Sequence, residues 1–293
     1  MDIIKTNLDQ WIRDWLSGIV FGNLESMVNS VNTQTRELAD IITARPSAWN
    51  PNIWQMITSV ADAVIVPIAA GILTFVMCME LIAWAQDKNN LHNSTDVIKQ
   101  LIWYVLKLGI GVMLVLKSKD ITIGIFDLGA WTISQVAGIQ TSPDALVLSL
   151  SVVKDQLKDM EIGTLIALTF TSLVGGLGIQ AVSLITRLIV MGRMLEIYIY
   201  CSVGSAPYAT LTNSKISSIG ANYIKNLLAL AFQGFFMFLM LGIYSVLIND
   251  TISSVATGGD ATSLVLEMLF ISFVLCMMLM RSKSIAKSIF SAQ

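Results

Sequence analysis

Apolar and polar positions divide this chain into an amphipathic beginning and a long apolar remainder. Over residues 1–45, apolar side chains recur at helical spacing with charged and amide side chains between them. The pattern predicts an amphipathic helix with Trp11 and Trp15 on its apolar side. Such a helix lies in the membrane interface, or it packs on a partner or on the chain's own bundle. Pro46 and Pro51 predict its end.

Residues 46–293 are predicted to form a polytopic transmembrane domain. A membrane-spanning helix needs about 20 mostly apolar residues. Six stretches meet this requirement: Ile57–Ala83, Ile98–Leu116, Ile162–Ile185, Leu188–Ala206, Leu227–Ile248 and Leu264–Met280. The fold class expected is therefore an all-α integral membrane protein with six transmembrane helices.

A seventh stretch, Ile121–Ile139, is long enough to cross but contains Asp127, Gly124 and Gly129. A re-entrant or interfacial helix explains it as well as a span does. If the C-terminus is cytoplasmic, six spans place the N-terminus in the cytoplasm and seven place it outside. The distribution of lysine and arginine along the chain favours six spans.

Positive charges orient the C-terminal end. Arg281, Lys283 and Lys287 follow the last apolar stretch, whereas the loop before it carries only Asp250 and Asp260. Cytoplasmic loops of membrane proteins are enriched in lysine and arginine. The C-terminus is therefore predicted to be cytoplasmic, in the plasma membrane of a bacterium.

The composition agrees with a membrane protein, since 55% of the residues are hydrophobic and 13% are charged. A net charge of −2 gives no sign of a basic face for nucleic acid. One histidine and three cysteines make a metal cluster or a disulfide framework an unlikely basis for the fold. We expect Cys78, Cys201 and Cys276 to be small apolar side chains within apolar stretches.

Charged residues inside the apolar stretches are the candidate functional residues. A charge at the centre of a membrane helix costs about 2.5–3.5 kcal/mol on insertion scales, so it normally faces a bundle interior or a wet path. Arg193 and Glu196 are one helical turn apart and are expected to pair. Lys107 lies mid-span and is expected to pair with Glu80 or Glu196, or to face a wet cavity. Lys107, Arg193, Glu196 and Glu80 together form a predicted intramembrane polar seam.

Prolines and glycines mark predicted irregularities. Pro67 and Pro207 are expected to kink or stop their helices. Gly175, Gly176 and Gly178 lie within VGGLG and allow another backbone to approach closely. Close approach and an interfacial helix both favour lateral packing, so we expect a homo-oligomer.

Catalytic motifs are missing from the sequence. No glycine-rich loop leads into Gly-Lys-Ser/Thr, and His92 stands alone in a short polar loop. We therefore expect no enzymatic activity, no catalytic residue, no cofactor and no metal site.

Two stretches carry a resemblance to a known family. One is WNPNIWQMITSVADAVIVPIAAGILTFVMCMELI, Trp49 to Ile82, with Asn-Pro ahead of a proline-containing span that closes on Glu-Leu-Ile. The other is RMLEIYIYCSVGSAPYATL, Arg193 to Leu211, with Arg-x-x-Glu followed by Ala-Pro. Together they resemble the TrbL-like polytopic membrane subunit of type IV secretion and conjugal transfer systems, in its short branch from Gram-positive conjugative elements.

The resemblance implies a channel-forming subunit that passes single-stranded DNA with its attached relaxase. It also implies oligomeric assembly with conjugation ATPases, a coupling protein and other secretion-channel subunits. The matching motif positions are Asn50, Pro51, Pro67, Glu80, Arg193, Glu196 and Pro207. The chain lacks the large extracellular domain of longer relatives.

Two other functions fit the residues. A secondary transporter or small-solute channel would also use intramembrane charges, and internal repeats with broken helices would distinguish it. No such repeat is visible, although Pro67 and Pro207 could be a weak trace of one. A membrane scaffold without a conduit of its own is the third reading.

Overall fold

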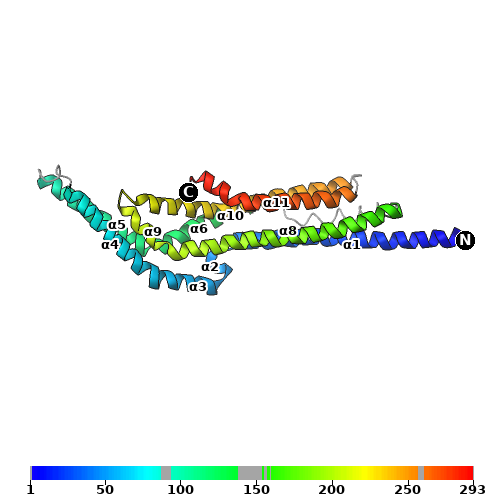
Figure 1. Ribbon diagram of the computed structural model, residues 1–293, viewed down its shortest axis with the longest axis horizontal. Coiled ribbons are helices and arrows are strands. Elements are labelled where there is room, and N and C mark those ends of the chain that lie inside the picture. The colour runs from blue at the N-terminus through cyan, green and yellow to red at the C-terminus, as the bar shows by residue number, and fades with distance from the viewer. Residues whose placement is uncertain are drawn as a thin grey trace. The chain divides into compact units, whose positions relative to one another are not determined.

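The computed structural model describes residues 2–86, 94–137, 154, 157–158, 160–256 and 261–292, and all the regular elements within these ranges are helices (Figure 1). The helices are α1 (Asp2–Thr43), α2 (Pro46–Trp49), α3 (Pro51–Val60), the π-helix η1 (Ala61–Ile65), α4 (Val66–Gln86), α5 (Ser94–Leu116), α6 (Ser118–Ala137), α8 (Ile162–Val203), α9 (Ser205–Ala209), the 3-10 helix η4 (Thr210–Thr212), α10 (Ser217–Ala256) and α11 (Ala261–Ile289). The predicted all-α membrane fold is confirmed. His92 lies outside the described residues.

Five helical stretches are long and apolar enough to cross a membrane. They are Pro51–Gln86, Val97–Leu116, Ile162–Val203, Ser217–Ser254 and Ser263–Ile289. The doubtful segment after residue 121 is helical up to Ala137, within α6, but it is not among the five.

The two spans expected between Ile162 and Ala206 are one continuous helix, α8, of 42 residues. At 1.5 Å per residue it is about 63 Å long, roughly twice the hydrocarbon thickness of a bilayer. The prediction of two spans was wrong, because Thr186 and Arg187, which separate the two apolar stretches, do not interrupt the helix.

The chain forms two compact units. Unit 1 contains residues 1–43, 134–191 and 236–282, and unit 2 contains residues 44–133, 192–235 and 283–293. Long helices contribute to both, since α8 and α10 each begin in one unit and end in the other. The division into an N-terminal region of residues 1–45 and a transmembrane domain of residues 46–293 stays a prediction.

In unit 1, α1 packs on the chain's own helices. Its buried side chains include Val20, Leu24 and Val28, all fully buried, and Asn23 donates to Ser172 of α8 at 3.0 Å. Trp11 and Trp15 remain exposed and stack on each other with ring centroids 6.4 Å apart. Of the two readings left open by the sequence, the structure shows α1 packed within the bundle.

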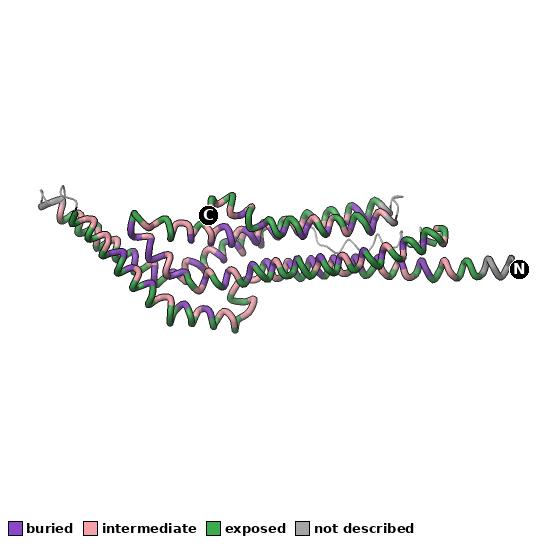
Figure 2. Tube along the Cα trace, in the orientation of Figure 1, coloured by how far each residue is buried: buried purple, intermediate pink, exposed green. Residues whose placement is uncertain are grey.

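In unit 2, the short helix α9 packs between α4 and α5. Ala69, Leu73 and Met77 of α4 form a buried cluster with Val115 of α5 and Ala209 of α9. The remaining surface of the α4–α5 hairpin is mostly exposed or half-buried (Figure 2). Only 6% of the apolar stretch of α5 is buried within the chain.

Candidate functional site

Unit 2 brings together the two stretches that carry the family resemblance. The hydroxyl of Tyr198 on α8 donates to the carbonyl of Pro46 at 2.8 Å. Its ring packs against Trp49 and Trp54, with ring centroids 5.7 and 6.2 Å away. Asn50 begins α3, because its side-chain oxygen accepts from the Ile53 amide at 3.1 Å. The two motif stretches thus pack together in one region of unit 2.

Pro67 is accommodated by a change of helix type. It is the second residue of α4, which directly follows the π-helix η1. At the end of η1, the Val66 amide donates to the Ala61 carbonyl five residues earlier. Proline has no N–H and its ring collides with the carbonyl four residues before it. The π-turn absorbs this conflict, and such turns are common positions of helix bending.

Lys107 and Glu80 form an ion pair between α5 and α4. Lys107 Nζ lies 2.5 Å from Glu80 Oε1, and Asn213 donates from Nδ2 to Glu80 Oε2 at 2.9 Å. Asn213 itself is 2% exposed and accepts at Oδ1 from the Lys215 amide at 2.8 Å. Glu80 therefore connects the hairpin to the segment that follows η4.

Arg193 is buried without an ion pair in the described structure. Arg193 is 6% exposed, and its Nε donates to the Leu230 carbonyl at 3.4 Å. Its Nη1 has no hydrogen-bond partner among the described residues. Gly234 of α10 makes room for the guanidinium, since a Cβ there would lie 2.5 Å from Nη2. Burial of an arginine held this way is costly, because no carboxylate among the described residues offsets the desolvation of its charge.

The expected pairing of Arg193 with Glu196 is not found. Glu196 instead pairs with Lys283 near the end of α11, at 2.6 Å. Spacing of one turn puts both side chains near one face of α8, but a longer side chain from another helix can reach the carboxylate better. Of the predicted seam, the structure joins Lys107 to Glu80 and gives Arg193 and Glu196 separate partners.

Pro207 lies where α8 ends. The helix stops at Val203, four residues before the proline, and α9 begins at Ser205. If the helix continued, the ring of Pro207 would collide with the carbonyl of Val203. Tyr208 next to it is 1% exposed, and burial raises the pKa of its phenol.

The VGGLG glycines lie in unit 1, whereas Lys107, Glu80, Arg193 and Glu196 lie in unit 2. A Cβ at Gly175 would lie 2.5 Å from Val265 of α11, and one at Gly178 would lie 2.5 Å from Leu269. Gly176 points elsewhere, with Met27 of α1 at 3.7 Å. Two of the three glycines therefore serve close packing between α8 and α11 of the same chain.

The described residues include no group of three or more His, Cys, Asp or Glu side chains placed to hold a metal ion. Sequence reasoning missed Tyr198, Asn213, Gly234 and Lys283. Lys283 and Asn213 carried a weak signal, because an intramembrane carboxylate needs a donor, but several residues could have supplied it. The position of Gly234 opposite Arg193 had no signal in the sequence.

Comparison with known proteins gives one family. Residues 31–205 match the family described as TrbL/VirB6 plasmid conjugal transfer like protein. No curated protein and no solved structure matches the chain. The matched stretch covers more than half of the chain and includes both motif regions up to the start of α9. The chain therefore belongs to the TrbL/VirB6 plasmid conjugal transfer-like family and is a multi-pass membrane subunit of a conjugal transfer, type IV secretion complex.

Proposed function

We propose that this protein is a non-enzymatic channel or scaffold subunit of the conjugative machine, which helps translocate single-stranded DNA with its attached relaxase. It works as a homo-oligomer in the bacterial plasma membrane, with a cytoplasmic C-terminus. Its partners are the conjugation ATPases, the coupling protein and the other secretion-channel subunits. Family membership supports the complex, and the features below support a role at the conduit.

The observation that carries the proposal is the exposure of Lys107, which lies in the middle of the apolar helix α5 and pairs with Glu80 of α4. The side chains of Lys107 and Glu80 are 41% and 19% exposed. On α5 the neighbouring Trp103, Leu106 and Ile110 are 63%, 48% and 48% exposed. Lipid tails cannot hydrate an ammonium group, so this face meets water or another protein subunit.

A conjugation assay tests the proposal. Donor cells lacking the gene should transfer no plasmid, and the unmodified gene should restore transfer. Lys107→Met should reduce transfer at least tenfold while Lys107→Arg keeps most of it, because arginine preserves the charge. Lys117→Met is the matched control, since Lys117 pairs with Asp120 on an exposed surface. Transfer at normal frequency without the gene would refute the proposal.

Contact with DNA separates conduit from scaffold. Donors are cross-linked with formaldehyde during transfer, and the protein is then precipitated. Recovery of the transferred strand, but not of a plasmid lacking a transfer origin, supports a conduit. Failure to recover the transferred strand from cells that transfer normally would overturn the conduit role. Native mass measurement in mild detergent should show an oligomer, and a monomer alone would contradict the assembly.

Orientation has its own test. A reporter that is active only outside the membrane should be silent when fused at Gln293. The same reporter inserted near Gly258, which lies outside the described residues, should be active. The reverse pattern would overturn the cytoplasmic C-terminus.

A further inference from the structure

A polar surface in unit 1 lies beside an apolar membrane helix. Helix α1 runs in the same direction as the first part of α8, as three side-chain contacts in order along both helices show. Asn23 donates to Ser172 at 3.0 Å, Gln34 donates to Thr186 at 2.5 Å, and Glu37 pairs with Arg187. Residues 23–37 of α1 therefore lie level with residues 172–187 of α8.

This part of α8 has the character of a membrane span. It contains no charged residue from Ile162 to Thr186. Its outward side chains are large and apolar, for example Phe170 at 72%, Leu177 at 62% and Leu184 at 61% exposed. A stretch of this length and character fits the hydrocarbon core. The adjoining part of α1 must then lie at membrane depth as well.

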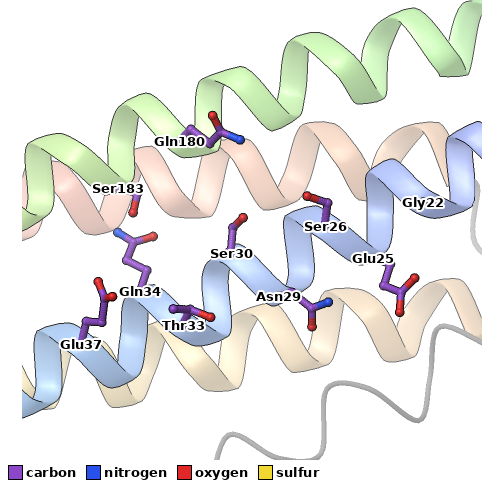
Figure 3. A pocket seen from close by; sticks show the side chains of 10 residues that line it. All are labelled: Gly22, Glu25, Ser26, Asn29, Ser30, Thr33, Gln34, Glu37, Gln180 and Ser183. Atoms are coloured by element: carbon purple, nitrogen blue, oxygen red, sulfur yellow. The ribbon is translucent and has the colours of Figure 1, made fainter.

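The free face of α1 at this depth is polar. A hollow of about 580 Å³ lies over it, lined by small and polar side chains of α1 and by Gln180 and Ser183 of α8 (Figure 3). Gly22, Ser26, Ser30 and Thr33 are among the α1 residues. A second hollow of about 230 Å³ shares Ser26, Ser30 and Gln180 with the first. We call this continuous surface the α1–α8 groove.

The α1–α8 groove is lined by carboxylates and neutral polar side chains and by no lysine or arginine. Glu25 and Glu37 are among the lining residues of the larger hollow, and no lysine or arginine is. Arg187 reaches Glu37 from α8, so one carboxylate is partly neutralised. Gln34 is 5% exposed, and its Oε1 has no hydrogen-bond partner among the described residues although its amide nitrogen donates to Thr186.

Lipid tails would leave these hydroxyl, amide and carboxylate groups unsatisfied, at a cost of several kcal/mol for each isolated group in hydrocarbon. The groove therefore holds water or a polar chain. A phosphodiester backbone is bound chiefly through lysine and arginine, which are absent from the lining of the larger hollow, and the carboxylates of Glu25 and Glu37 repel phosphate. A polypeptide brings N–H groups and basic side chains that match acceptors.

We propose that the α1–α8 groove is a hydrated path at membrane depth that accommodates polypeptide rather than nucleic acid. The inference rests on the proposed function, in which the relaxase protein accompanies the DNA. It assigns the polypeptide part of that substrate to unit 1.

Water access to the groove is tested first, in the full-length protein in membranes. Cys78, Cys201 and Cys276 are replaced by alanine, and single cysteines are introduced as Ser26→Cys, Thr33→Cys, Phe170→Cys and Leu184→Cys. A membrane-impermeant charged thiol reagent should modify the two groove positions at least tenfold faster than the two lipid-facing positions. Equal, slow modification at all four positions would overturn the hydrated groove.

The substrate class is tested in donor cells during transfer, with a photo-reactive phenylalanine analogue at position 33. An adduct with the relaxase polypeptide supports the proposal. An adduct with DNA, an adduct with a second copy of this chain, or no adduct with the relaxase overturns it. The thiol experiment needs no transfer, so failure of the proposed function, seen as normal transfer without the gene, is distinguishable from failure of the groove.

Discussion

The two units use different polar chemistry between their helices. Unit 2 uses ionic groups, namely the Lys107–Glu80 pair, the Lys283–Glu196 pair and the buried Arg193. The contacts within unit 1 are mainly between neutral side chains, as in Asn23 with Ser172 and Tyr244 with Ser272, the latter at 3.0 Å. Its Arg187–Glu37 pair is about half exposed on both sides.

The difference matters because the two kinds of contact fail differently. Breaking a buried ion pair leaves a charge without a partner and costs about 3–5 kcal/mol when fully buried. Neutral hydrogen bonds between membrane helices average only about 0.6 kcal/mol. Unit 2 should therefore tolerate substitution poorly at its polar positions, whereas unit 1 should depend on the fit of its helices.

The largest expected effect comes from filling the space around Arg193. Gly234→Leu places atoms where the guanidinium lies, since even a Cβ would be 2.5 Å from Nη2 and 2.8 Å from Cζ. We expect the free energy of unfolding to fall by about 3 kcal/mol, in the upper part of the range for overpacking. Thermal unfolding in detergent, followed by size-exclusion chromatography, measures it. Gly109→Leu is the control because no atom lies within 4 Å of its Cβ position. Equal melting of both variants would contradict the tight fit.

Next in size is the loss of Lys107. Lys107→Met leaves Glu80 with Asn213 as its one side-chain donor among the described residues, and we expect the free energy of unfolding to fall by about 2 kcal/mol because the pair is partly exposed. The double variant Lys107→Met with Glu80→Gln should lose less than the sum of the two single variants. Unfolding midpoints of the three variants in detergent provide the comparison. Strict additivity would mean that the two residues do not interact.

A smaller effect is expected in unit 1 at the glycine positions. Gly175→Val meets Val265 of α11 and should lower the free energy of unfolding by about 1 kcal/mol, the lower end of the range for overpacking. Gly176→Ala has only Met27 at 3.7 Å and should change stability by less than about 0.5 kcal/mol. The difference in melting temperature between the two variants checks this. The opposite order would mean that Gly176, and not Gly175, faces the close helix contact.

The smallest effect tests a neutral contact. Asn23→Ala removes the hydrogen bond to Ser172 and should cost about 0.6 kcal/mol. Asn29→Ala, on the exposed face of the same helix, should be neutral within about 0.5 kcal/mol. Denaturation of both variants under matched conditions measures the difference. A loss above about 2 kcal/mol for Asn23→Ala would remove the distinction between the units.

Much of the fold follows from hydropathy, because a run of apolar residues at helical length has few alternatives in a membrane. The Lys107–Glu80 pair was one of three options for Lys107, since a mid-span ammonium must find an acceptor. The partner of Glu196 could not be deduced, because Lys283 is 87 residues away and only the packing of α11 brings it near. Helix α8 was divided in error because a single charged residue between two apolar stretches does not end a helix.

The shared direction of α1 and α8 constrains how the chain threads the membrane. Two helices that cross in the same direction must be separated by an odd number of crossings. If α1 crosses beside α8, the chain between the two helices must return to the side of the membrane on which α1 began. An even number of crossings between them would require α1 and α8 to run in opposite directions, which the three ordered contacts contradict.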